Sequence, residues 1–523
     1  MQDSATKRNL LLDDSLRYPG FSIVLMQYFP FVLKDKSSLD SSFFSPLSEN
    51  ENIDNQIFKI VDKSQINRFN LKGFRFKVEF NEPYHLKLEC DVKVQMAYLL
   101  KNIASIRYKF YFEKENINTD CPLGASTDHI ISLLSTHLSG EHWSSYDNET
   151  DINVCIKNFH VMNFPIDEFG NIKETRTFSL KNGTQIFDQV SSLYRRAICN
   201  YAEEIFKSEK LESSDELHYA MVDIWENVAH VEDSLKNENL FKKSNSKSSL
   251  TEAEIIEHIE NYHKKELIGL MTLYPGEWRY RDERAYKDVC GDNIAIDTDD
   301  LVLANTNLAV VIGTYRRRGS DSPTNWEKLD DRKIFGVSWA EYLSILEMLL
   351  AKKYIISIAK DKLIETSYNI LKQDISEIIG KIAELSIKIT YLQLSMDVVK
   401  VSKFVSHKVM HDRTAERLEI AKDNEELKNV IESLDSNLQN LGEYKSMKSE
   451  YALNLVLIFI SIISAFEILF QSTELPFLGY FGIAGSRLAV TLIFIVIFFI
   501  IFGTLFAISK LINDIIKRVK GKY

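Results

Sequence analysis

The sequence lacks the motifs and residue patterns that mark most enzymes. Neither of the glycine-rich phosphate-binding motifs, GxxxxGK(S/T) and GxGxxG, is present, the GxSxG motif is missing, and the acidic residues are scattered. There are only 5 cysteines among 523 residues, and no two of them form a CxxC pair. Reduced structural thiols are therefore expected, and we predict that the protein is not an enzyme.

Positive charge is scarce over most of the chain. The formal net charge is −11, and because residues 451–523 carry +3, residues 1–450 carry −14. Binding to DNA or RNA polymers needs a basic surface, so neither is expected as a direct partner, while a local pocket for an anion stays open. The N-terminus has no long apolar segment of the kind found in signal peptides, and we expect the front of the chain to stay in the cytosol.

Long apolar runs are confined to the C-terminal end, at Leu453–Phe470 and Leu488–Ser509. As helices they reach about 27 and 33 Å, enough to cross a bilayer core of about 30 Å. Basic residues flank the pair on its outer sides, so both termini are predicted to be cytoplasmic. We predict transmembrane helices over 451–470 and 488–509, an extracytoplasmic loop over 471–487 and a basic cytosolic tail over 510–523. A buried hairpin inside a protein core is the alternative.

The first apolar run carries its polar residues on one side. At about 100° per residue they fall within an arc of about 140°, and a polar stripe in lipid usually faces a bundle interior or water. In an oligomeric ring this stripe would line a pore with a ring of carboxylates. The alternative is that these groups bond between helices. The predicted pore-lining residues are Asn454, Ser461, Ser464, Glu467 and Gln471.

A long helical region precedes the first apolar run. No proline lies between Pro323 and Pro476, and Ser338 with Glu341 forms a capping box that marks a helix start. We predict a helical hairpin and a coiled-coil stalk over 338–450, with a bend at 406–414. The stalk packs either against another subunit or against earlier helices of the same chain. Its heptad positions are Ile420, Leu427, Leu434 and Leu441.

Strand and helix patterns are mixed in residues 1–335. This mixture predicts an α/β domain with polar loops at 34–55 and 236–249, and we expect this domain to act as a sensor. The expected strands are 21–32, 74–80, 85–94, 107–112, 152–160 and 301–312, and the expected helices are 128–138, 185–207 and 252–265.

Arginine and aromatic residues concentrate in the segment 278–318 of this acidic domain. Arginine binds phosphate through two parallel hydrogen bonds, and tryptophan or tyrosine can stack on a base. The cluster therefore predicts a site for a nucleotide-like anion. Ion pairs with Asp282 and Glu283, or a salt-bridge belt between subunits, are the alternatives. The cluster consists of Trp278, Arg279, Arg281, Arg284, Tyr315, Arg316, Arg317 and Arg318.

The order of the segments over residues 260–523 resembles the CorA family of two-span metal-ion transporters. The approach to the first apolar run, Tyr444-Lys445-Ser446-Met447-Lys448, is similar to the lysine-flanked entry of that family. Where the family has Gly-Met-Asn, the nearest counterpart here is Gly482-Ile483-Ala484, which has no asparagine to meet a hydrated cation. CorA-like proteins without the motif occur beside type III CRISPR systems, where they are thought to act as membrane effectors switched by a nucleotide second messenger.

The resemblance implies an α+β membrane protein: a CorA-like funnel, most often a homopentamer, in the bacterial inner membrane. Its expected function is a ligand-gated ion channel of antiviral defence. The opening ligand would be a small nucleotide-type anion, for example an S-adenosylmethionine-linked adenylate. The expected partners are the lipid bilayer and further copies of the chain. One alternative is a transporter of Mg²⁺ or another divalent cation with a variant selectivity loop; another is a membrane-tethered binding or scaffold protein without a pore. No covalent cofactor is expected, and the sequence identifies no metal ligands.

Overall fold

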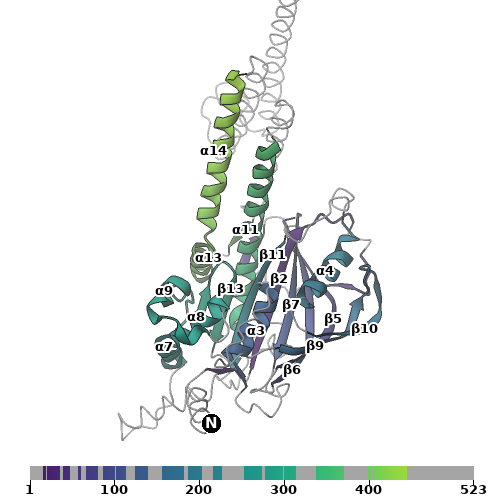
Figure 1. Cartoon of the computed structure of the whole chain (residues 1–523), viewed down its shortest axis with the longest axis vertical. Coiled ribbons are helices and arrows are strands. Elements are labelled where there is room, and N and C mark those ends of the chain that lie inside the picture. Colours follow the sequence, from purple (N-terminus) through teal and green to yellow (C-terminus); the bar gives the residue numbers. More distant parts are fainter. Residues whose placement is uncertain are drawn as a thin grey trace, which may run out of the picture. The chain divides into compact units, whose positions relative to one another are not determined.

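The structure is a computed structural model of the whole chain (Figure 1). It describes residues 16–18, 20–35, 39–47, 57–60, 66–80, 86–100, 102–112, 124–138, 156–181, 186–202, 216–226, 252–273, 277–298, 300–313, 337–369, 399–401 and 404–444. The chain divides into two compact units, Met1–Asn437 and Leu438–Tyr523. Nearly all of the described residues belong to the first unit.

A sheet of ten strands forms the centre of the first unit. The strands are β2 (Gly20–Pro30), β3 (Phe44–Pro46), β5 (Ile66–Phe80), β6 (Lys87–Leu99), β7 (Ile103–Phe112), β9 (Ile156–Ile166), β10 (Ile172–Lys181), β11 (Leu217–Glu226), β12 (Asp300–Ala304) and β13 (Leu308–Gly313). Their order is β10-β9-β5-β6-β7-β2-β11-β13-β12, and β3 pairs with β5. Neighbours are antiparallel except β11 and β13, which are parallel.

The side chains of the central strands alternate between two hydrophobic cores. In β2, Phe21, Ile23 and Leu25 belong to the first core, whereas Val24 and Met26 belong to the second. β5 and β6 differ, because along much of their length buried apolar residues alternate with partly or fully exposed polar ones. This pattern is typical of strands with one packed face and one face toward solvent.

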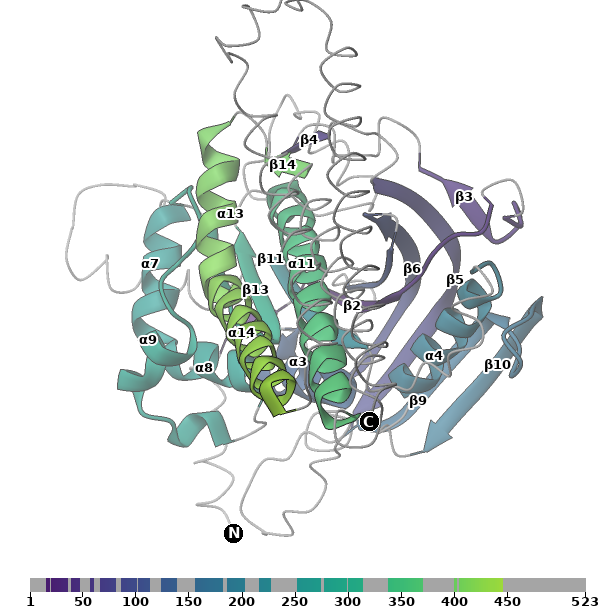
Figure 2. The ribbon, with the colours of Figure 1, turned by 90° about the horizontal axis from the view of Figure 1, so that it is seen from above.

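Helices cover the two faces of the sheet unequally. The first core takes residues from α3 (Thr127–Leu138), α4 (Ile186–Cys199), α7 (Glu252–Tyr262) and α8 (Lys264–Thr272). The second core depends on one long helix, α11 (Val337–Asn369), whose Leu343, Leu346 and Leu350 are buried in it. Figure 2 shows β5 and β6 curving away to one side of α11. Part of the second face of these two strands therefore lies beyond the helix.

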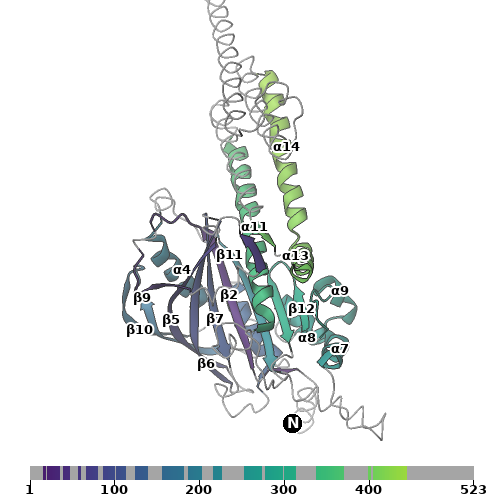
Figure 3. The same cartoon turned by 180° about the vertical axis from the view of Figure 1, so that it is seen from behind.

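Short elements complete the described structure. The 3-10 turns η6 (Glu277–Tyr280) and η7 (Glu283–Ala285) lead into α9 (Tyr286–Val289), and two small sheets pair β1 (Arg17–Tyr18) with β8 (Ala125–Ser126) and β4 (Phe58–Ile60) with β14 (Val399–Val401). The helices α13 (Val405–Arg417) and α14 (Ile420–Tyr444) follow. Figure 3 shows α11 and α14 side by side, as in Figure 1.

The break between α13 and α14 lies later than the predicted bend. Residues 406–414 are helical in the structure, and the chain turns at Glu419, which has a left-handed φ of 56°. Ile420 and Leu427 of the predicted heptad are buried in the second core with α11. At these two positions the helix packs against its own chain, which was one of the two expectations for the stalk.

The described structure contradicts the predicted fold class. The residues in the ranges above form a mixed α/β protein dominated by a large sheet, whereas an α+β membrane protein was expected. No helix within these ranges is both long and apolar enough to cross a membrane. The longest, α11, has 33 residues, but it carries Lys353 and Lys360, which form ion pairs with Asp423 and Glu426 of α14. Its apolar residues pack on the sheet.

The same finding corrects the predictions of a membrane protein, of an ion channel and of a multi-pass location in the inner membrane. In the described parts of the chain, long helices bury their apolar residues in protein cores and pair their charges with other elements. The predicted transmembrane helices at 451–470 and 488–509, the loop at 471–487 and the tail at 510–523 themselves lie outside the described residues.

Candidate ligand pocket on the large sheet

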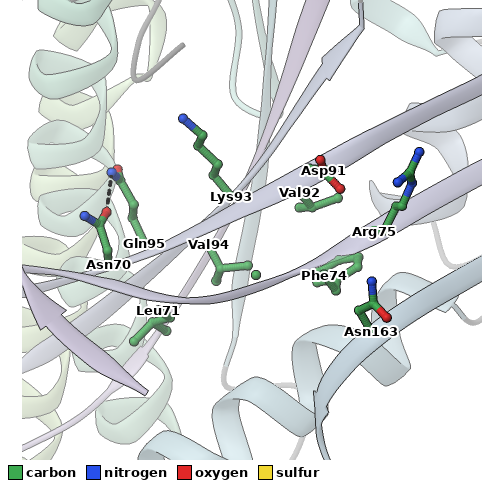
Figure 4. Close-up of a pocket in the computed structure, with 11 residues that line it drawn as sticks. Asn70, Leu71, Phe74, Arg75, Asp91, Val92, Lys93, Val94, Gln95 and Asn163 are labelled. Atoms are coloured by element: carbon green, nitrogen blue, oxygen red, sulfur yellow. Dashed lines mark hydrogen bonds between the residues drawn. The ribbon is translucent and has the colours of Figure 1, made fainter. Parts of the chain in front are cut away.

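A pocket of about 470 Å³ is lined mostly by residues of β5 and β6. Figure 4 shows the side chains of Asp91, Lys93 and Gln95 standing on one side of the strands. Leu71 and Phe74 point to the other side, where Asn163 lies beside Phe74. Its volume lies within the usual range for small-molecule sites. The lining residues are Asn70, Leu71, Gly73, Phe74, Arg75, Asp91, Val92, Lys93, Val94, Gln95 and Asn163.

An irregularity in strand pairing forms the floor of the pocket. The register between β5 and β6 shifts between Leu71 and Phe74, which is a bulge in an otherwise regular ladder. Gly73 lies in this bulge, and a Cβ at that position would collide with the carbonyl oxygen of Val92. Only glycine fits this close approach of two backbones without a shift.

The wall contributed by β9 depends on a second unusual backbone conformation. Asn163 has a φ of 56°, in the left-handed region. Asparagine tolerates this region better than most residues other than glycine. The side chain of Asn163 reaches the pocket from a strand adjacent to β5.

Charged and amide groups give the pocket its chemistry. Arg75 donates from Nε to Oε1 of Glu89 at 2.6 Å, and Gln95 donates from Nε2 to Oδ1 of Asn70 at 2.9 Å. In Figure 4, Lys93 stands between the Asn70–Gln95 pair and Arg75. The Arg75 and Glu89 side chains are 49% and 36% exposed, so their ion pair is worth little in solvent. Such a pair can exchange its carboxylate for an anionic ligand at low cost.

A buried ionic cluster lies under α11 at the covered end of the same strands. Glu347 of α11 has a fully buried side chain, and its carboxylate accepts from Arg107 of β7, Arg68 of β5 and Ser105 of β7. Burial raises the pKa of Glu347, but the attraction and hydrogen bonds of Arg107 and Arg68 outweigh it and lower that pKa to about 2. The carboxylate is therefore ionised at neutral pH.

Strand register places this cluster next to the pocket. Asn70 pairs with Gln95, and Gln95 pairs with Arg107 on the neighbouring strand. Arg68 precedes Asn70 by two residues on β5, and residues two apart lie on the same face of a strand. The pocket and the Glu347 cluster thus share one polar row that runs across the sheet.

The predicted arginine–aromatic cluster lies elsewhere, and two of its members serve packing. Trp278 is buried and donates from Nε1 to Oδ1 of Asp128 on α3 at 2.8 Å, while Arg279 donates from Nη2 to the other oxygen at 2.7 Å. The Arg279 guanidinium also stacks 4.2 Å from the Trp278 ring centre. These contacts attach η6 to α3.

Of the remaining members of that cluster, two lie on the surface of the described structure and four lie outside the described residues. Arg284 forms an ion pair with Asp282 at 2.6 Å on the surface, which was one of the alternatives for the cluster, and Arg281 lies beside it in the turn. Three kinds of predicted site residues lie outside the described parts of the chain: the rest of the cluster at Tyr315, Arg316, Arg317 and Arg318, the pore-lining set at Asn454, Ser461, Ser464, Glu467 and Gln471, and the loop at Gly482, Ile483 and Ala484.

A second cavity, of about 350 Å³, lies between α9, the β12–β13 turn and the junction of α13 and α14. Its charged lining is mostly acidic, with Asp288, Glu416 and Glu419 against Arg417. Among the described residues, no group of three or more histidine, cysteine, aspartate or glutamate side chains could hold a metal ion. We therefore take the pocket on β5 and β6 as the candidate site.

Sequence reasoning missed both the pocket and the Glu347 cluster, although each left a trace. Glu347 is the one charged residue in the apolar run Tyr342–Ala351, and such a residue needs a buried partner. Gly73 interrupts a strand pattern, which is a known sign of a bulge. The sequence pattern does not reveal the strand register that brings β5, β6, β7 and β9 together.

Comparisons with protein-family models, with curated proteins and with solved structures give no match to this chain.

Proposed function

We propose that this protein binds a small nucleotide-type anion in the pocket on β5 and β6 and acts as a ligand-responsive regulator. The proposal keeps the ligand class predicted from the sequence and moves its site from the arginine–aromatic cluster to the sheet. It includes no pore. Self-association as a homopentamer and binding of a divalent cation stay predictions.

The pocket itself carries the proposal. It combines two cations, Arg75 and Lys93, and one carboxylate, Asp91, with three carboxamides, and its volume of about 470 Å³ suits a ligand of nucleotide size. Cations attract a phosphate or carboxylate group, and carboxamides both donate to and accept from the edge of a base.

The test is calorimetric titration of the full chain with adenosine monophosphate (AMP) and with pApA, a linear diadenylate carrying two phosphates. We expect at least one probe to bind with a Kd below about 1 mM. The double variant Arg75→Gln/Lys93→Gln should weaken binding at least tenfold, because both cations are lost.

Lys77→Gln is the matched control, since Lys77 lies on the same strand, pairs with Glu79 and does not line the pocket. It should change the affinity less than twofold. Failure of both probes to bind, or equal weakening by the control, would rule out a nucleotide-type ligand at this pocket.

A further inference from the structure

Four donor contacts from strands of the sheet converge on the carboxylate of Glu347. Oε1 accepts from Arg107 Nε at 2.6 Å and from Ser105 Oγ at 2.8 Å. Oε2 accepts from Arg68 Nη2 at 2.6 Å and from Arg107 Nη2. All of these donors belong to strands of the sheet, and only the carboxylate comes from a helix. Arg107 binds the carboxylate through two nitrogens and Arg68 through one. Bidentate arginine contacts of this kind also recognise a phosphate or a ligand carboxylate.

This anion site adjoins the candidate pocket. Lys93 of the pocket lies two residues from Gln95, and Gln95 pairs with Arg107 across the ladder. With about 3.4 Å per residue and about 4.8 Å between strands, Lys93 and Arg107 are separated by about 8 Å at their Cα atoms. A ligand with two anionic groups could therefore reach both cationic positions.

We propose that Arg68, Arg107 and Ser105 form a second anion subsite of the pocket, which Glu347 occupies in this structure and from which a ligand with two anionic groups displaces it. This inference rests on the proposed function and deepens it. It states the ligand class as one with two anions, each phosphate or carboxylate, spaced for neighbouring positions on the sheet.

Displacement of Glu347 has a consequence for α11. The carboxylate is fully buried under the helix, so a ligand can replace it only if α11 shifts. Lys353 of α11 donates to Asp423 of α14 at 2.6 Å, and Lys360 pairs with Glu426. Ile420 and Leu427 of α14 are also buried in the second core with α11, so we expect a shift of α11 to move α14. The ligand drives the shift only as far as it binds the displaced state more tightly than the state described here.

The test compares pApA, with two phosphates, and AMP, with one, by calorimetry on Glu347→Gln. The glutamine keeps the size of the side chain but competes poorly for two arginines. We expect pApA to bind at least tenfold more tightly than to the unmodified chain, and AMP to change less than twofold. An unchanged pApA affinity in a folded Glu347→Gln protein would overturn the subsite.

A second variant protects the test against poor folding. Glu347→Asp keeps the charge but shortens the side chain, so its carboxylate cannot reach every donor, and pApA should bind about threefold more tightly. If Arg75→Gln/Lys93→Gln abolishes binding of both probes while both Glu347 variants leave pApA unchanged, the proposed function stands and the subsite is wrong. If neither probe binds the unmodified chain, the proposed function is wrong, and the subsite that rests on it is wrong as well.

Discussion

The two ends of β5 and β6 carry the same kinds of residues in very different surroundings. At the covered end, Arg68 and Glu347 have side chains that are 3% and 0% exposed. At the open end, Arg75 and Glu89 form an ion pair of the same length, 2.6 Å, but are 49% and 36% exposed. Breaking the covered pair leaves a buried charge without its partner and strongly destabilises the fold. The open pair contributes little to stability and can exchange partners easily. One face of one sheet thus holds both a buried ionic contact, which only a tightly bound ligand would displace, and an exposed ion pair that a ligand can replace easily.

Removal of the buried carboxylate of Glu347 should cause the largest loss of stability. We expect Glu347→Ala to lower the free energy of unfolding by about 3–5 kcal/mol, because it leaves two arginines buried without that carboxylate. Urea denaturation measures the change. Glu89→Ala is the matched control at the open end and should cost less than about 1 kcal/mol. Similar losses in the two variants would mean that burial does not separate the two ends.

The loss of stability in acid should follow the protonation of the Glu347 carboxylate. Its pKa is lowered from 4.5 to about 2 in the folded protein, so its contribution is complete above pH 4.5 and is lost as the pH falls toward 2. The loss is on the order of 3 kcal/mol. Because Glu347→Gln cannot titrate, its stability should fall less steeply over this interval. Parallel pH profiles of the two proteins would contradict the assignment.

A methyl group added at Gly73, in the bulge, should cause an intermediate loss of stability. Gly73→Ala forces β5 and β6 apart at the pocket floor, since the new Cβ meets the Val92 carbonyl oxygen. Overpacking of this kind costs about 1–3 kcal/mol. Thermal unfolding measures the loss, and Lys72→Ala, at an exposed neighbouring position, should change stability by less than about 0.5 kcal/mol. Equal melting temperatures for the two variants would show that the bulge adapts.

The smallest effect is expected from the open ion pair itself. A double-mutant cycle on Arg75→Ala and Glu89→Ala should give a coupling energy below about 1 kcal/mol, falling further in 1 M salt. A coupling that is larger and independent of salt would mean that this pair is held as strongly as the buried one under α11.

Local patterns predicted many individual elements well. The observed starts of β2, α3, α4 and α7 lie at 20, 127, 186 and 252, and the expected starts were 21, 128, 185 and 252. These segments have strong apolar periodicity of their own. The run 301–312 was expected as one strand and is instead a hairpin, β12–β13. Its turn is held by Asn305, whose Oδ1 accepts from the backbone N–H groups of Asn307 and Leu308 at 2.9 Å each.

The site was harder to predict because it depends on register. Arg68 and Arg107 are 39 positions apart and meet Glu347 only through the pairing of β5, β6 and β7. Arg279 and Arg284 were predicted to bind an anion because arginines are dense in their segment, yet both form ion pairs with aspartates.

The most direct test of the central claim is hydrogen–deuterium exchange of the full chain with and without pApA. We predict slower exchange in residues 70–75 and 91–95, where the ligand binds, and faster exchange in residues 342–351 of α11, where Glu347 is displaced. Protection confined to residues 277–284, or no change at any of these segments with pApA bound, would contradict the account.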